Sequence, residues 1–274
     1  MKYIFFDVDG TLVNHDNLIS DSTIQAIQSL KEQGHMVFIA TGRNKAGISR
    51  QVFEIGFDGM VTSNGAYIEY QGDIIYQESI DHDVLVRFSK ELEKGRANLL
   101  YSNYQACFAT DPAREQFFPT VDEHDIRIKL FKEYYESTVV IEDVESLKDT
   151  CIENVDFKNY YGDLEAFVKQ FSSELRILPS SIEFDDIGGS GEVMGLGVTK
   201  AEGIRRVLEH IGADREDAIA FGDGYNDFEM LDYVKVGVAM GNANEQLKQG
   251  ADIVAPHINE DGIYTVLREL GLIS

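Results

Sequence analysis

The sequence has little of what an extracellular, membrane-bound or nucleic-acid-binding protein needs. Cys107 and Cys151 are its two cysteines, too few for a disulfide framework and without zinc-site spacing. Lysine and arginine total 24 against 48 acidic residues, and the net charge of −24 predicts a surface that repels nucleic acid and anionic membranes. No apolar run reaches membrane-spanning length, and the N-terminal run ends at Asp7, too early for a signal peptide. We therefore expect a soluble, cytoplasmic protein with neither nucleic acid nor membrane as a partner.

The length and composition of the chain favour two packed domains. A chain of 274 residues exceeds one minimal domain. The apolar fraction of 43% and the charged fraction of 26% are typical of globular proteins and argue against disorder. Neither an internal repeat nor a low-complexity tract is visible in the sequence.

Both ends of the chain alternate short apolar runs with helical patterns. Strands are predicted over residues 3–6, 36–40 and 59–62, and a hairpin over 66–78. The same alternation returns after residue 199 with the runs AIAFG, VGVAM and DIVAP, each followed by a helical pattern. Alternation of this kind is typical of βαβ units, so we expect an α/β fold with a Rossmann-like, doubly wound parallel sheet.

The middle of the chain follows a different rhythm. From about Asp81, longer helical patterns such as DHDVLVRFSKELEKG and DPAREQFFPTVDEH mix with strand-like pieces such as LRILPSSI. The sequence thus predicts a discontinuous core over 1–80 and 189–274, interrupted by an inserted α+β cap domain over 81–188. We expect Gly188-Gly189-Ser190-Gly191 to be a flexible linker at the end of this insertion.

Paired carboxylates follow the first predicted strand. Asp7-Val8-Asp9-Gly10-Thr11 comes directly after YIFF, and a two-residue spacing on an extended backbone sends both carboxylates to the same side. One can act as a nucleophile while the other handles protons. In so acidic a chain the pair alone could be a solvated turn. Its position at the end of a buried strand, where open parallel sheets bind ligands, favours a catalytic function.

Two further motifs offer groups that could hold phosphate. Thr41-Gly42-Arg43 follows MVFIA, and its hydroxyl and N–H groups lead into a predicted helix, although a simple helix cap explains the threonine equally well. Lys200 begins the helix after GLGVT and has no special meaning alone.

The fourth motif is acidic and glycine-rich. In Gly222-Asp223-Gly224-Tyr225-Asn226-Asp227, which follows AIAF, Asp223 leaves the strand end and Asp227 lies one turn further on. The glycines permit close backbone approach to an ion or a phosphate. A helix-capping turn would account for Asp227 but poorly for Asp223.

Together these four motifs resemble the signature of the haloacid-dehalogenase (HAD) superfamily. The similarity lies in DVDGT, the threonine of ATGR, the lysine of GVTK and GDGYND. TSNGAYI, VAMGNA, ADIVA and EDGI resemble further stretches of its Cof-type phosphatases, whose cap is inserted between the second and third motifs. The resemblance covers roughly residues 1–80 and 190–274, and the cap matches by placement and size only.

The resemblance implies a role for each motif residue. Asp7 would be the nucleophile that forms an aspartyl-phosphate, and Asp9 the general acid and then base. Mg²⁺ would be held by the Asp7 carboxylate, the Asp9 main-chain carbonyl and Asp223. The phosphate group would be bound by Thr41, Gly42, Lys200 and Asn226, while Asp227 would support the site from behind.

Phosphate-ester hydrolysis is the expected reaction. The resemblance implies it through Asp9, since the transport ATPases, dehalogenases and phosphonate hydrolases of the superfamily lack this aspartate. A phosphomutase acting on sugar phosphates stays an alternative, and a non-catalytic module that binds magnesium or phosphate is a second one. A dinucleotide site is not expected, because no glycine fingerprint follows the first strand.

The substrate is expected to be a small phosphorylated metabolite, with sugar phosphates as the default implied by the resemblance and pyridoxal phosphate or flavin mononucleotide as alternatives. Arg43 and Asn64 are possible substrate contacts. The aromatic residues of the insertion are expected to form its core rather than a pocket; they are Phe117, Phe118, Tyr134, Tyr135, Tyr160 and Tyr161.

Overall fold

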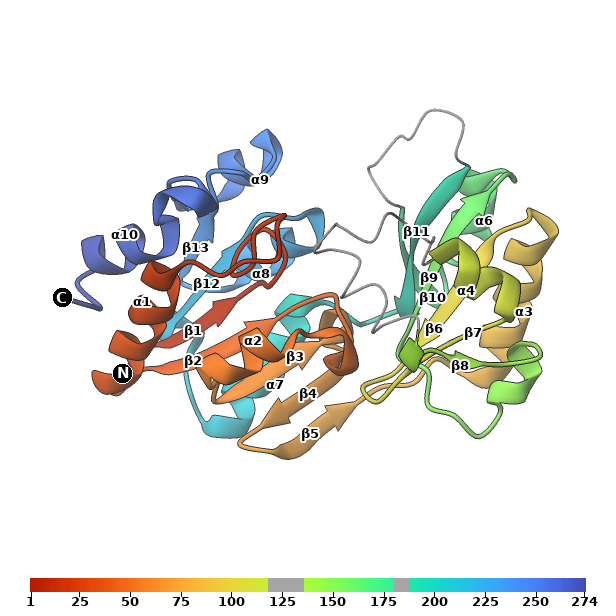
Figure 1. The fold of residues 1–274 in the computed structure, drawn as a ribbon, viewed down its shortest axis with the longest axis horizontal. Helices are drawn as coiled ribbons and strands as arrows, with labels where there is room; N and C mark the ends of the chain where they lie inside the picture. Colours follow the sequence, from red (N-terminus) through yellow and green to blue (C-terminus); the bar gives the residue numbers. More distant parts are fainter. Residues whose placement is uncertain (118–135, 180–187) are drawn as a thin grey trace. The chain divides into compact units, whose positions relative to one another are not determined.

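A computed structural model describes residues 1–117, 136–179 and 188–274 (Figure 1). The chain divides into two compact units. The first comprises Met1–Arg43, Ile48–Tyr76 and Thr199–Ser274, and the second comprises Asn44–Gly47 and Gln77–Val198. The predicted domain boundaries, after residues 80 and 188, stay a prediction.

The first unit is built on a sheet that has eight strands among the described residues. Their order is β14-β13-β12-β1-β2-β3-β4-β5, and neighbours from β14 to β3 run parallel while β4 is antiparallel to β3. The strands are β1 (Tyr3–Phe6), β2 (Met36–Ala40), β3 (Gly59–Thr62), β4 (Tyr67–Tyr70), β5 (Asp73–Gln77), β12 (Ala218–Gly222), β13 (Val236–Ala239) and β14 (Ile253–Val254). The strand order runs outward on both sides of the β1–β12 pair, so this pair is the topological switch point of the sheet.

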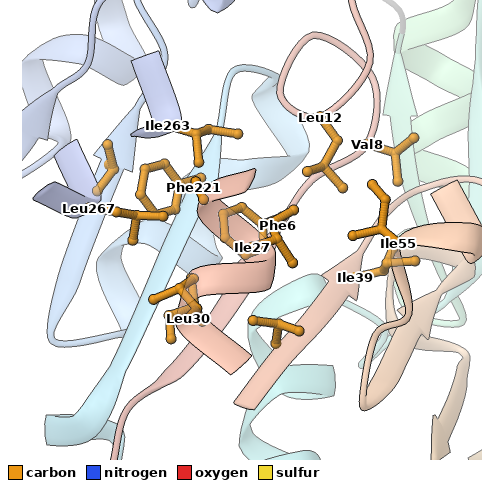
Figure 2. Close-up of a cluster of buried hydrophobic side chains, with 14 of the residues drawn as sticks. Phe6, Val8, Leu12, Ile27, Leu30, Ile39, Ile55, Phe221, Ile263 and Leu267 are labelled. Carbon is orange, nitrogen blue, oxygen red and sulfur yellow. The ribbon is translucent and has the colours of Figure 1, made fainter. Parts of the chain in front are cut away.

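Helices cover both faces of this sheet. They are α1 (Asp21–Glu32), α2 (Arg50–Ile55), α7 (Lys200–Ile211), α8 (Phe228–Tyr233), α9 (Glu245–Gly250) and α10 (Gly262–Glu269). On one face, Ile27 of α1 and Ile263 of α10 belong to a buried cluster that includes Phe6 of β1 (Figure 2). On the other face, Val207 of α7 and Met230 of α8 are buried in a second cluster. The predicted doubly wound α/β sheet is therefore confirmed.

Local sequence signals set the ends of several elements. Ser20 caps α1 by accepting the N–H of Thr23 at 3.2 Å, and Gly34 follows this helix with a φ of +79°, a conformation that glycine adopts at little cost. In the predicted hairpin, Gln71 and Gly72 both have positive φ, as the tightest turns between twisted strands require.

The second unit contains a smaller mixed sheet. Its described strands lie in the order β10-β11-β9-β6-β7-β8. Its elements are α3 (His82–Lys94), β6 (Asn98–Ser102), β7 (Cys107–Ala109), α4 (Asp111–Phe117), β8 (Val139–Val140), β9 (Asn154–Tyr160), α6 (Leu164–Phe171), β10 (Leu175–Pro179) and β11 (Gly189–Gly195). Phe88 of α3 and Phe167 of α6 pack on one face of this sheet around Phe157 of β9. The expected α+β insertion is present.

The predicted flexible linker at residues 188–191 is wrong. Gly189 and Gly191 lie in β11, which pairs with β9 and β10. A side chain at Gly191 would stand 2.6 Å from the carbonyl oxygen of Leu178 and 2.9 Å from the ring of Phe157. The glycine therefore permits close packing within a sheet, a use that sequence alone does not distinguish from a linker.

The expectation for the aromatic residues of the insertion holds in part. Phe117 and Tyr160 are buried, but Tyr161 is 62% exposed and does not belong to the core. Phe118, Tyr134, Tyr135, residues 118–124 of the second predicted helix and residues 180–182 lie outside the described residues. In the described part of the chain, none of the helices combines the length and apolarity needed to cross a membrane.

Candidate active site

The loop after β1 brings two acidic motifs together. Asp7 continues the strand by donating its N–H to the carbonyl of Phe221 in β12 at 2.9 Å, and Gly10 then turns the chain with a φ of +79°. A Cβ atom at Gly10 would overlap the carboxylate of Asp223. Only glycine therefore lets this loop lie against Asp223, and the Thr11 hydroxyl then donates to the same carboxylate at 3.1 Å.

Lys200 lies at the start of α7, where Thr199 caps the helix by accepting the N–H of Glu202 at 2.9 Å. Its side chain is 1% exposed, and its Nζ donates to Oδ1 of Asp7 and to Oδ1 of Asp227, both at 2.6 Å. A buried ammonium is tolerated only when paired, so the two carboxylates fix its position. The sequence alone gave Lys200 no special meaning, but in the structure its ammonium group contacts Asp7, the predicted nucleophile.

Asp227 is fully buried and both of its oxygens accept hydrogen bonds from the protein. Oδ1 accepts from Lys200, and Oδ2 accepts the backbone N–H groups of Asp223 at 2.9 Å and Gly224 at 2.8 Å. Asp227 therefore holds Lys200 and the Asp223 loop in one arrangement.

Carboxylate oxygens of Asp7, Asp223 and Asp227 lie within 4.8 Å of one another. Hard oxygen ligands at this spacing suit Mg²⁺ or Ca²⁺. Because donors already occupy both oxygens of Asp227, Asp7 and Asp223 are the two carboxylates better placed to bind an ion. The Asp9 carboxylate is not part of this group.

The electrostatics of the cluster show an excess of negative charge. Burial raises the pKa of Asp7 well above its usual range, with Asp227 and Asp223 adding to the effect and Lys200 opposing it. Burial and the Asp227 carboxylate raise the pKa of Asp223 to about 7. Burial alone would lower the pKa of Lys200, but Asp227 and Asp7 outweigh it and raise this pKa. A further cation fits such a donor set.

The predicted phosphate-binding residues gather beside the loop after β2. The Thr41 hydroxyl is buried and accepts the N–H of Arg43 at 3.1 Å. Asn226 donates through Nδ2 to Oδ1 of Asn64 at 3.0 Å, and a Cβ at Gly42 would stand 3.1 Å and 3.2 Å from these two atoms. Asn64 has a φ of +54°, a left-handed conformation that asparagine adopts more readily than most residues.

Arg43 contacts Asp9 rather than the carboxylates of Asp7, Asp223 and Asp227. Its Nε donates to Oδ2 of Asp9 at 2.6 Å and its second terminal nitrogen donates to Oδ1 at 2.5 Å. The two side chains thus form a two-point ion pair at the edge of the site.

The sequence-based set of site residues did not include Asn242. Its Nδ2 donates to the carbonyl of Gly10 at 2.7 Å and lies 3.4 Å from Oδ2 of Asp223, while its Oδ1 accepts the N–H of Ile258 at 3.1 Å. Asn242 therefore ties the two acidic loops together. It follows β13, so the rule that singled out polar residues after apolar strands would have found it.

Comparison with known proteins identifies the family. The model of the haloacid dehalogenase-like hydrolase family, Hydrolase_3, matches residues 4–267. The chain belongs to the haloacid dehalogenase-like hydrolases. Putative phosphatase YkrA of Bacillus subtilis is 33% identical over 278 residues, which are 99% of this chain and 98% of the relative. The predicted superfamily and the predicted enzyme class, a HAD-type phosphoric monoester hydrolase, are confirmed.

Two further relatives of this HAD hydrolase have more specific names. The 5-amino-6-(5-phospho-D-ribitylamino)uracil phosphatase YitU of Bacillus subtilis is 29% identical over 287 residues, covering 97% of this chain and 96% of YitU. The solved structure of the HAD subclass IIB sugar phosphatase BT4131 matches with a TM-score of 0.77 and 28% identity, covering 100% of both chains.

Proposed function

We propose that this HAD phosphatase hydrolyses a small phosphorylated metabolite through an aspartyl-phosphate on Asp7. The observation that carries the proposal is the contact of Lys200 with Asp7 at the switch point of the sheet, next to Asp223. A nucleophile, a cation and an acidic metal-binding group meet there, where open α/β sheets bind ligands.

The metal would be Mg²⁺, held by the Asp7 carboxylate, the Asp9 main-chain carbonyl and Asp223. When bound, it supplies the positive charge that lets a carboxylate approach a phosphate dianion. The closely spaced carboxylate oxygens of Asp7 and Asp223 support this assignment. The hydrogen bonds that both oxygens of Asp227 accept from the protein support a role for that residue behind the metal.

The reaction has two balanced steps. In the first, an Asp7 oxygen attacks phosphorus, the bond to the leaving oxygen breaks, and that oxygen takes a proton from the Asp9 carboxyl group. In the second, water gives a proton to Asp9 and attacks phosphorus, and the bond between phosphorus and the Asp7 oxygen breaks. The products are an alcohol and phosphate, and both aspartates return to their starting states.

The remaining site residues bind the phosphoryl group. Lys200, held by Asp227, would neutralise its charge, and Thr41, Gly42 and Asn226 would orient its oxygens. Asn64 bonds to Asn226 and would support it. Phosphoryl transfer needs mainly positioning and charge stabilisation, which these groups supply.

The names of two relatives support a substrate class. A sugar phosphate or a phosphorylated ribityl compound is proposed, because BT4131 is named a sugar phosphatase and YitU a phosphatase of a phosphoribitylamino compound. The inserted domain would select the leaving group as a cap.

The proposal is tested by phosphate release from a panel of hexose phosphates, glycerol phosphate, flavin mononucleotide and pyridoxal phosphate, with Mg²⁺ or with a chelator. We expect hydrolysis only with Mg²⁺, and we expect Asp7→Asn to lower turnover by about a thousandfold or more. Circular dichroism would show that the variant is folded. Wild-type turnover by folded Asp7→Asn would refute the covalent mechanism.

The phosphomutase alternative has its own signature. A mutase would convert one sugar phosphate into its isomer and would need a bisphosphate activator. Isomerised sugar phosphate without release of inorganic phosphate would replace the hydrolase proposal.

A further inference from the structure

Arg43 and Asp9 form the only two-point arginine–carboxylate pair that reaches the site among the described residues. The guanidinium plane meets both carboxylate oxygens, at 2.6 Å and 2.5 Å. The arginine is itself anchored, because its backbone N–H donates to the Thr41 hydroxyl in the loop proposed to bind phosphate. The pair therefore connects the phosphate-binding loop to the proposed general acid.

Asp9 differs from the other carboxylates of the site in its exposure. Its side chain is 54% exposed, whereas the side chains of Asp7 and Asp227 are 7% and 0% exposed. In the part of the chain that the structure describes, Arg43 is the one side chain hydrogen-bonded to the Asp9 carboxylate. An exposed carboxylate rotates freely unless something holds it, and a general acid must keep its direction toward the leaving oxygen.

We propose that Arg43 is a positioning residue that orients Asp9 for proton transfer. The inference rests on the proposed role of Asp9. A guanidinium presents several N–H groups in one plane, so one hydrogen bond to Asp9 can persist while the other carboxyl oxygen turns toward the leaving group with its proton. Lysine offers a single point charge and holds the direction of a carboxylate less well.

This role makes the effect of Arg43 depend on the leaving group. The oxygen of a sugar must be protonated as it leaves, whereas para-nitrophenolate leaves readily without a proton. Loss of the positioning residue should therefore slow hydrolysis of sugar phosphates and have little effect on para-nitrophenyl phosphate. A residue that binds the phosphoryl oxygens would affect both substrates alike.

The test compares Arg43→Ala and Arg43→Lys with the wild-type enzyme, in the full chain with Mg²⁺. The substrates are para-nitrophenyl phosphate and the hexose phosphate that the wild type hydrolyses fastest. For Arg43→Ala we expect kcat to fall about tenfold on the hexose phosphate and less than about twofold on para-nitrophenyl phosphate, with KM nearly unchanged. Arg43→Lys should lie between Arg43→Ala and the wild type.

A double-mutant cycle shows whether Arg43 acts through Asp9. Asp9→Asn alone should lower kcat on the hexose phosphate by about a hundredfold or more. If Arg43 acts through Asp9, adding Arg43→Ala should then lower kcat no further. Arg50→Ala is the matched control, because Arg50 forms an exposed ion pair with Glu54 on α2, and it should leave both activities unchanged.

Three outcomes would overturn the inference. Equal loss on both substrates, or a full effect of Arg43→Ala in the Asp9→Asn background, would show that Arg43 contacts the phosphoryl group directly. An unchanged kcat on both substrates would show that the ion pair has no role in turnover. Failure of the proposed function looks different, since the wild type would then release no phosphate or Asp7→Asn would stay active.

Discussion

β1 of the first sheet is buried along its whole length, whereas β9 of the second sheet alternates between a buried and a more exposed face. Helices cover both faces of the first sheet, so polar side chains can stand only where its strands end. In β9, Val155 and Phe157 face the core, while Asp156 and Lys158 lie on the opposite face. A functional position is therefore easier to read from sequence in the first sheet than in the second.

The face of the second sheet opposite Val155 and Phe157 carries a half-buried carboxyl group, that of Asp156. Asp156 lies opposite Leu100 of β6 and Glu192 of β11 in the strand register. Burial and the Glu192 carboxylate raise the pKa of Asp156 to about 8, and Lys158 opposes this only in part. The sequence did not single out Asp156, because an acidic residue in a strand of alternating pattern cannot be told from an ordinary solvent-facing residue.

The largest expected effect is at the site on the first sheet, where removing the charge of Lys200 should lower both stability and turnover. Lys200→Met leaves Asp7 and Asp227 buried without their partner, so we expect the free energy of unfolding to fall by about 3–5 kcal/mol. Turnover should fall by about a hundredfold or more because the phosphoryl group loses its cation. Urea unfolding and phosphate release measure the two effects.

Lys235→Met is the control for this variant, since Lys235 forms an exposed ion pair with Glu216 in the same unit. It should change neither quantity appreciably. A similar loss of stability and turnover in both variants would mean that the buried ion pairs of Lys200 with Asp7 and Asp227 contribute no more than an exposed ion pair.

The second unit should depend on the aromatic cluster around Phe167. Phe167 is 2% exposed, and its ring centroid lies 5.1 Å from that of Phe171 and 5.7 Å from that of Tyr160. Phe167→Ala should lower the free energy of unfolding by about 3–5 kcal/mol through the cavity it leaves. Calorimetry should show the loss in one of two transitions if each unit is stabilised by its own core.

Phe53→Ala is the matched control for the aromatic cluster, because Phe53 of α2 is 37% exposed. It should shift neither transition by more than a small amount. One transition that moves as a whole in Phe167→Ala would contradict separate stabilisation of the two units.

The last expected effect concerns Asp156 and depends on pH. The pKa of Asp156 in the folded state, about 8, lies above that of an unfolded aspartate, so its folded form binds the extra proton. The associated stability is present below about pH 4 and is lost as the pH rises through about 8. Asp156→Asn should therefore match the wild type near pH 4 and be more stable near pH 9, in urea unfolding.

Asp149→Asn, an exposed change in the same unit, should show no such dependence on pH. If Asp156→Asn alters stability equally at both pH values, the raised pKa of Asp156 does not govern the stability of this face.

The positions of the polar site residues at the ends of the first sheet's strands could be predicted, because each follows a short apolar run that is recognisable in the sequence. This holds for Asp7, Thr41, Asn64 and Asp223, whose strands have the predicted bounds or differ by a residue. The linker assigned to Gly188–Gly191 could not be corrected in this way, because glycine serves turns, linkers and closely packed strands alike.

The sequence by itself determined which chemical groups stand at the ends of the strands, since local periodicity and turn residues act over a few positions. Only the tertiary structure decided which of these groups meet. Thr11 bonds to Asp223 across 212 positions, Lys200 to Asp7 across 193 and Arg43 to Asp9 across 34. Such contacts depend on the order of the strands and on the packing of the helices, because a hydrogen bond requires two atoms to lie about 3 Å apart whatever their separation along the chain.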